Sequence, residues 1–189
     1  MTDTCASIDE IERMAKAAGW RRIGVDGAGG AGKSHLADEL SQVLDIPVLD
    51  VDDYLHRNQG GYVDFVDYPA LSAALSSMPA LILSGACLRQ VLANMGEDLD
   101  GHIYVMRMRD GLWVDEDECV FPDGVEVAIE NLANGAAMIS QYLDEPTEAV
   151  VSERDDESLR LSFEIMRYHS EFSPHETADV IYERHEHAA

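Results

Sequence analysis

Residues 27–34 read Gly-Ala-Gly-Gly-Ala-Gly-Lys-Ser, and this stretch decides the fold of the chain. It matches the pattern G-x-x-x-x-G-K-[ST] at every fixed position. Residues 22–26 (RIGVD) form a short apolar run that predicts a buried strand, and the apolar residues of 36–44 recur at helical spacing. A strand before the glycine loop and a helix after it are the context that this motif requires. We therefore predict a P-loop, which is a loop that binds phosphate.

Each residue type in the loop suits that task. Glycines let the backbone turn its N–H groups inward around phosphate oxygens, and the N-terminus of the following helix adds partial positive charge. We expect Lys33 to reach the terminal phosphates and the Ser34 hydroxyl to bind Mg²⁺. The predicted ligand is therefore a nucleoside triphosphate with Mg²⁺. The residues expected to hold it are Gly27, Gly29, Gly30, Ala31, Gly32, Lys33, Ser34 and His35.

The strongly acidic charge of the chain excludes some classes of binding partner. The formal net charge is -24, from 37 acidic and 13 basic residues, and the only lysines are Lys16 and Lys33. Such a field repels nucleic acid and anionic lipid, so we expect neither as a partner. The same field opposes the binding of a nucleotide unless cations nearby offset the charge of its phosphates. One of the two lysines, Lys33, stands at the position of the motif where such a cation is needed.

Length and cysteine content indicate one intracellular domain. The 189 residues suit a single domain, and we expect residues 1–189 to form one. Cys5, Cys87 and Cys119 are an odd number and widely spaced, so neither a disulfide framework nor a zinc site is indicated. No apolar run reaches the length of a membrane span, and the chain does not start like a signal peptide. We expect a soluble cytoplasmic protein.

Strand and helix patterns alternate along the whole chain. Such alternation implies right-handed crossovers and a parallel sheet covered by helices on both faces. We therefore predict an α/β fold, the three-layer P-loop NTPase fold, with a parallel sheet of about five strands and a lid-like region at about 110–157. The expected strands are 22–26, 46–51, 79–83, 102–108 and 178–182.

Beyond the loop, the chain resembles the uridine kinase-like branch of the P-loop nucleoside and small-molecule kinases. The loop is the specific part of the resemblance, and the order of the other pieces supports it over most of residues 22–182. Those pieces are Gly24-Val25-Asp26-Gly27 before the loop, Val51-Asp52-Asp53-Tyr54-Leu55, residues 64–71 (DFVDYPAL), residues 99–105 (LDGHIYV), and Tyr168, Pro174 and residues 178–181 (ADVI).

This resemblance implies ATP-dependent phosphoryl transfer to a hydroxyl of a nucleoside or another small molecule. Asp52 falls on the position of the family's general base, and Lys33 on that of its catalytic lysine. Asp53 stands beside Asp52 as a candidate metal ligand, although adjacent side chains at a strand end point in opposite directions. Arg154 lies where the family often carries a lid arginine that stabilises the transferring group, with Arg160 in reserve.

The chain also departs from the family pattern. The third strand ends in Ser84-Gly85, where the family commonly has an acidic residue, and residues 115–118 are acidic where an arginine-rich helix is usual. A nucleotide-binding regulator without transfer chemistry, a pseudokinase, therefore stays open, as does another kind of P-loop ATPase. Tyr54, His56 and Tyr62 are candidates for an acceptor pocket.

Overall fold

The strand that leads into the P-loop lies inside the sheet, with other strands on both sides. The computed structural model describes residues 3–56, 61–142 and 150–186, with side chains described at 3–56, 61–138 and 158–186. Strand order is β1-β7-β5-β2-β4-β3, all parallel, and β6 pairs with β5 in the antiparallel sense. The strands are Asp3–Cys5 (β1), Arg22–Gly27 (β2), Val48–Asp50 (β3), Leu81–Ser84 (β4), Gly101–Arg109 (β5), Leu112–Trp113 (β6) and Val180–His185 (β7).

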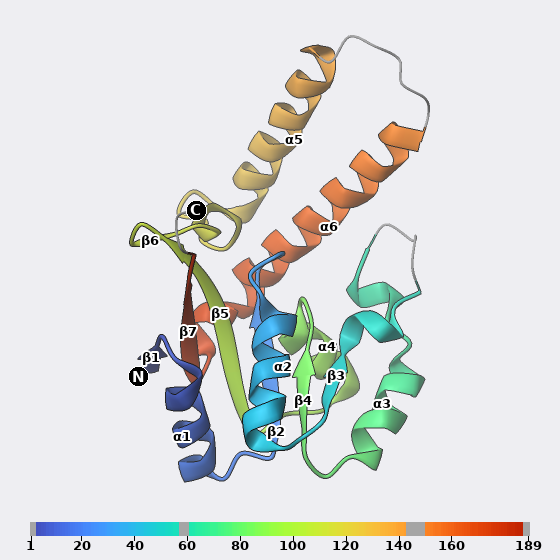
Figure 1. Ribbon diagram of the computed structural model, residues 1–189. Helices are drawn as coiled ribbons and strands as arrows, with labels where there is room; N and C mark the ends of the chain where they lie inside the picture. Colours follow the sequence, from blue (N-terminus) through green and yellow to red (C-terminus); the bar gives the residue numbers. More distant parts are fainter. Residues whose placement is uncertain (1–2, 57–60, 143–149, 187–189) are drawn as a thin grey trace.

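Helices cover both faces of this sheet, which gives the three layers that the alternating pattern predicts (Figure 1). The α-helices are Ile8–Ala18 (α1), Lys33–Leu44 (α2), Tyr68–Ser77 (α3), Leu88–Met95 (α4), Val125–Tyr142 (α5), Val150–Phe172 (α6) and Pro174–Thr177 (α7). Three short 3-10 helices are Val51–Tyr54 (η1), Val63–Phe65 (η2) and Glu116–Glu118 (η3).

Two apolar cores hold the layers together. Between the sheet and α1/α2, Ile11 and Leu36 pack against Ile23 and Val180. On the other face, a second core joins α3, α4 and the C-terminal half of α6 to the sheet. Full burial of an aliphatic side chain contributes roughly 1.5–3 kcal/mol, so these cores fix the strand ends that carry the P-loop. The second core includes Leu71, Leu81, Leu83, Leu88, Ile165 and Tyr168.

The described sheet has seven strands, two more than the sequence patterns indicate. The extra strands are β1, which pairs with β7 at the edge, and β6, which folds back on β5. They span only three and two residues, and within β1 only Cys5 is buried, so no alternating apolar pattern marks them.

The second predicted strand is also shorter than expected. It ends at Asp50, and Asp52 and Asp53 lie in the 3-10 helix η1 instead of at a strand end. The Asp50 carboxylate starts this turn by accepting a hydrogen bond from the Asp52 N–H at 3.0 Å. The strand alternation that the sequence suggests for Asp52 and Asp53 therefore does not apply to them.

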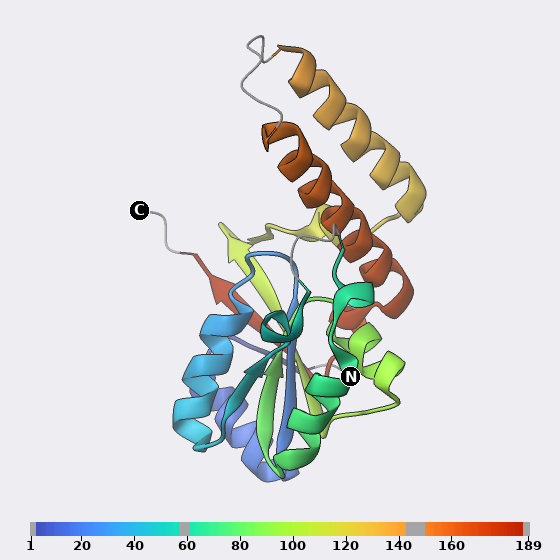
Figure 2. The ribbon, with the colours of Figure 1, turned by 90° about the vertical axis from the view of Figure 1, so that its right-hand side faces the viewer.

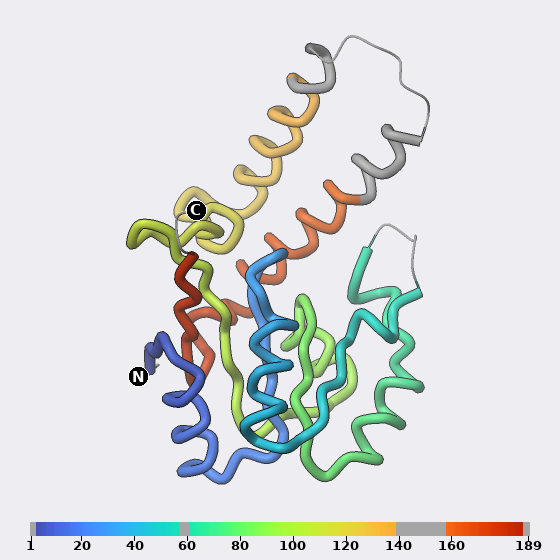
Figure 3. The backbone as a smooth tube through the Cα atoms, in the orientation of Figure 1, coloured from blue at the N-terminus to red at the C-terminus, as the bar shows by residue number. Residues whose placement is uncertain are grey.

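Helices α5 and α6 lie side by side and extend away from the sheet (Figure 2). Gly135 does not interrupt α5, which continues as helix from Val125 to Tyr142. Figure 3 follows the backbone out along α5 and back toward the sheet along α6. Within the described ranges, every helix is too short or too polar to span a bilayer.

Candidate functional site

The P-loop starts at the C-terminal end of β2 in a conformation that requires glycine. Gly27 pairs with Val105 of β5, and a Cβ atom on Gly27 would come within 2.8 Å of the Val105 carbonyl oxygen. Gly32 has φ 99°, in the left-handed region, and caps the N-terminus of α2. The sequence motif therefore forms the predicted loop between strand and helix, at the C-terminal end of the inner strand β2.

Lys33 closes over the loop that it follows. Its Nζ donates to the Gly27 carbonyl at 3.0 Å and to the Ala28 carbonyl at 2.8 Å. Gly32 has no side chain to cap α2, so the first N–H groups of the helix remain donors for an anion. His35, the last of the predicted loop residues, has an exposed ring that lies 3.4 Å from the Glu39 carboxylate. These donors and the ammonium group form a cradle that suits a chain of phosphates.

The Ser34 hydroxyl lies beside a carboxylate that the motif does not contain. Its Oγ donates to Asp50 Oδ2 at 3.3 Å, and burial raises the pKa of Asp50. Asp53, the predicted metal ligand, is exposed on η1. Sequence reasoning missed Asp50 because it extended the strand through Val51. The signal for it was a third aspartate two residues before Asp52, at the end of the apolar run.

Ser84 of β4 is a third residue with a side-chain oxygen at this end of the strands. It lies opposite Asp50 in the register of β3 and β4 and is buried. Its Oγ has no hydrogen-bond partner among the described residues, which is costly for a buried hydroxyl. Oxygen ligands suit Mg²⁺, which binds to one or two protein groups and keeps waters and phosphate oxygens. The residues present therefore fit a magnesium ion bound together with a nucleotide.

Asp52, the predicted base, is held by a buried tyrosine. The Tyr62 hydroxyl donates to Asp52 Oδ1 at 2.7 Å and accepts a hydrogen bond from the Ala86 N–H at 3.1 Å. Burial and the Asp52 carboxylate both raise the pKa of Tyr62, so the hydroxyl keeps its proton. Tyr62, a candidate for the acceptor pocket, therefore contacts Asp52 directly.

Helix α6 fixes the position of that tyrosine. The Glu164 carboxylate accepts hydrogen bonds from the N–H groups of Tyr62 at 2.7 Å and Val63 at 2.8 Å. Four residues further along α6, the Tyr168 hydroxyl donates to the buried carboxylate of Asp26, which also accepts from the Gly27 N–H at 2.7 Å. Burial raises the pKa of Asp26. One helix therefore contacts both the P-loop and the segment that carries Tyr62, a role that the sequence did not reveal.

The predicted lid arginines have different positions. Arg154 belongs to α6, and its side chain lies outside the described part of the chain. Arg160 lines a cavity of about 390 Å³ together with Val63 and Arg167. Among the described side chains, no arginine of α6 contacts the P-loop.

One arginine reaches the P-loop from a strand, and two others lie near it. Arg184 of β7 packs against Gly32, where an added Cβ atom would lie 3.0 Å from the Arg184 Cδ and Nη1. Arg107 and Arg109 lie on the neighbouring strand β5, and all three guanidinium groups face Glu186. Arg107 also pairs with Asp115, one of the acidic residues of 115–118. The sequence patterns did not point to Arg184.

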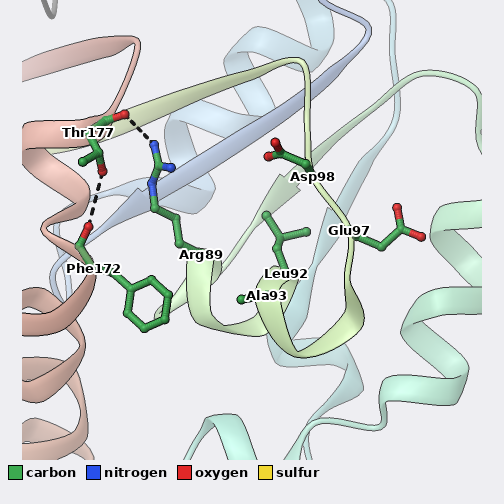
Figure 4. Close-up of a pocket in the computed structure, with 7 residues that line it drawn as sticks. All are labelled: Arg89, Leu92, Ala93, Glu97, Asp98, Phe172 and Thr177. Atoms are coloured by element: carbon green, nitrogen blue, oxygen red, sulfur yellow. Dashed lines mark hydrogen bonds between the residues drawn. The ribbon is translucent and has the colours of Figure 1, made fainter.

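Two further cavities differ in their relation to the loop. A cavity of about 730 Å³ is lined by His35 of α2, Tyr182 and Arg184 of β7, and the start of α1, so it adjoins the P-loop. Another, of about 310 Å³, lies between α4 and the segment before β7 (Figure 4), where Arg89 donates to the Thr177 carbonyl at 2.7 Å. Its lining residues belong to α4, to the segment before β5 and to the ends of α6 and α7, and none of them is a P-loop residue.

Fold and loop together define the class: the chain has the three-layer P-loop NTPase fold, with the phosphate-binding loop at the end of an inner parallel strand. Comparison with known proteins adds no family to this. No protein-family model matches the chain, and no curated protein matches it.

Among solved structures, the chain is similar to three proteins that are named as kinases. A candidate fructose transport system kinase from Silicibacter sp. TM1040 shows 12% identity and a TM-score of 0.49, over 94% of this chain and 100% of that one. Shikimate kinase from Bacteroides thetaiotaomicron shows 14% identity and a TM-score of 0.40, over 86% and 85%. Shikimate kinase from Aquifex aeolicus shows 15% identity and a TM-score of 0.36, over 86% of each chain.

Proposed function

We propose that this protein is an ATP-dependent phosphotransferase that transfers the γ-phosphoryl group to a hydroxyl of a small molecule. The observation that carries the proposal is the arrangement at one sheet edge of a complete P-loop, Lys33 over it, and two carboxylates, Asp50 and Asp52, beside it. Phosphoryl transfer needs mainly positioning and charge neutralisation, together with a carboxylate that takes the proton of the attacking hydroxyl.

The residues divide these tasks. The P-loop amides and Lys33 would bind the phosphates, and the acceptor oxygen would attack the γ-phosphorus while the bond to the β-phosphate oxygen breaks. Asp52, which is oriented by Tyr62, would accept the proton of the acceptor hydroxyl. Mg²⁺, when bound, neutralises charge on the β- and γ-phosphates. Ser34 would hold it, with Asp50 in reach and Asp53 as the ligand that the sequence predicts.

The resemblance to uridine kinase-like enzymes suggests a nucleoside as the acceptor. The site leaves a sugar or another small alcohol equally open, because the fold does not fix the substrate. The cavity beside His35 and Arg184 adjoins the P-loop and is large enough for the nucleoside part of ATP.

A nucleotide-binding regulator is the second candidate function. Ser84 occupies the strand end where the related enzymes carry an acid, and the acidic residues of 115–118 replace their arginines. The oriented carboxylate of Asp52 favours the enzyme instead, because a regulator does not need a base at that position.

ATP consumption separates the two functions. The purified protein is incubated with ATP and Mg²⁺, alone and with a panel of nucleosides, sugars and small alcohols. We expect acceptor-dependent formation of ADP. In Lys33→Ala, nucleotide-induced thermal stabilisation should be lost, whereas Lys16→Ala, which changes the only other lysine, should behave like the unmodified protein. Asp52→Asn should bind ATP but lose at least about 100-fold in transfer rate, the scale of general base catalysis.

Three results would contradict parts of this proposal. ATP binding without turnover on any acceptor would favour the regulator. Acceptor-independent hydrolysis would indicate another kind of P-loop ATPase. Normal turnover by Asp52→Asn would show that Asp52 is not the base.

A further inference from the structure

Bound nucleotide needs more positive charge than the P-loop provides. A triphosphate carries about four negative charges at neutral pH, and Lys33 together with a bound Mg²⁺ would offset about three of them. The net charge of -24 raises this demand, since the field of the whole molecule repels an anionic ligand. The additional cations therefore have to lie close to the loop.

Arg184 meets this requirement by its place in the sheet. Its side chain packs directly on Gly32, the residue that precedes Lys33, and it also lines the cavity of about 730 Å³ beside the loop. Its Nε is buried and has no hydrogen-bond partner among the described residues. A planar guanidinium in this position can donate two parallel hydrogen bonds to phosphate oxygens.

The neighbouring charges explain how the arginine stays in place without a ligand. The register of β5 and β7 puts Arg107 opposite Arg184, and two like charges on adjacent strands repel each other. Glu186 offsets this repulsion, since its carboxylate lies 2.9 Å from Arg184 Nη2 and 3.9 Å from Arg107 Nη1. A phosphate group could replace Glu186 as the anionic partner of Arg184.

We propose that Arg184 binds the phosphates of the nucleotide held by the P-loop, and that Glu186 keeps the guanidinium beside the loop until the nucleotide replaces it. This inference rests on the proposed nucleotide binding and deepens it. It places a phosphate-binding arginine on strand β7, whereas the resemblance to the kinase family implies such an arginine in the lid. Arg184 is a nucleotide-binding residue in this proposal, and Glu186 is a positioning residue.

Calorimetric titration with Mg²⁺-ATP at fixed ionic strength tests the proposal. Arg184→Gln should weaken ATP binding at least about tenfold, the size expected for a charged hydrogen bond, and Arg184→Lys should retain part of the affinity. Arg109→Gln is the matched control, because it removes the same charge from another partner of Glu186, and its side chain is 59% exposed. It should change the affinity less than about threefold, as expected for an exposed charge.

Glu186→Gln provides a test of opposite sign. It removes the competing carboxylate and should tighten ATP binding, whereas Glu183→Gln, the same charge change on the same strand, should have a smaller effect. Equal affinities in Arg184→Gln and Arg109→Gln would overturn the proposal, as would weaker binding in Glu186→Gln. A lower melting temperature of Arg184→Gln without nucleotide, at unchanged ATP affinity, would show that Arg184 only braces Gly32. If the unmodified protein binds no nucleotide, the proposed function itself fails.

Discussion

Asp50 occupies the last position of β3, where its two carboxylate oxygens face different groups. One accepts the Asp52 N–H, which starts the η1 turn, and the other accepts the Ser34 hydroxyl. The same side chain therefore shapes the turn that carries Asp52 and lies beside the P-loop hydroxyl. Asp53 is exposed three residues beyond the strand end. At the scale of single residues, the question is which of these aspartates serves the magnesium ion.

Asparagine substitutions answer it. In Asp50→Asn we expect the Mg²⁺ concentration for half-maximal stabilisation by ATP to rise about tenfold, because a charged ligand near the cation is lost. Asp53→Asn is the matched comparison, since it makes the same change on the adjacent turn. The measurement is the ATP-induced shift in melting temperature during a Mg²⁺ titration, with EDTA as the zero point. A larger effect in Asp53→Asn would favour the metal ligand predicted from the sequence.

Helix α6 is the element that links distant parts of the candidate site. Glu164 and Tyr168 of this helix contact the Tyr62 segment and the base of the P-loop, respectively. His169, the next residue, packs against β5, where its Nε2 lies 2.9 Å from the Tyr104 hydroxyl and its Nδ1 2.8 Å from the Ile165 carbonyl. Since a carbonyl only accepts, Nδ1 carries the proton, and in the neutral imidazole Nε2 then accepts from Tyr104. Burial favours this neutral form of His169.

The pH dependence of stability follows from that interface. Burial lowers the pKa of His169 from the ordinary value of 6.5 to about 4. Between pH 4 and pH 6.5 the unfolded chain binds a proton at His169 that the folded protein does not bind. The contribution of the neutral imidazole to the free energy of unfolding is therefore fully present above pH 6.5. As the pH falls toward 4, this contribution decreases by up to about 3 kcal/mol.

Denaturant unfolding from pH 7 to 4.5 measures this loss. We expect His169→Gln to be less stable than the unmodified protein at pH 7 but to lose less further stability on acidification. His185→Gln is the control, because His185 is 51% exposed and should leave the pH profile unchanged. Parallel profiles for the unmodified protein and His169→Gln would show that the imidazole interface does not titrate as described.

The whole molecule is governed by its charge. Because the net charge is -24, the acidic side chains of the folded protein repel one another. The arginines around Glu186 instead place positive charge near the P-loop. Repulsion of this kind is long-ranged at low salt and screened at high salt, since the Debye length falls from about 30 Å at 0.01 M to about 3 Å at 1 M.

Salt should therefore stabilise the protein. We expect the melting temperature in the absence of nucleotide to rise by about 2–8 °C between low salt and 1 M chloride, the equivalent of about 1–2 kcal/mol. NaCl and KCl should act alike, because screening depends on ionic strength, and sucrose serves as the uncharged control. A melting temperature that is constant or falls with salt would show that self-repulsion does not limit stability.

The sequence by itself determined the P-loop, the alternation of strands and helices, and the three-layer fold. These features depend on neighbouring residues: the glycine spacing of 27–34 sets the loop conformation, and apolar periodicity sets each element. The two short strands escaped prediction because two or three residues carry no periodic signal, and the early end of β3 escaped it because the apolar run continues into Val51.

Only the tertiary structure decided which side chains meet at the site. Ser34 and Asp50 are 16 residues apart, Tyr62 and Glu164 are 102 apart, and Arg184 reaches Gly32 from the last strand. Such pairs depend on strand order and register, which bring distant residues to one edge of the sheet. Sequence spacing carries no direct record of that register, because it results from the packing of the two cores as a whole.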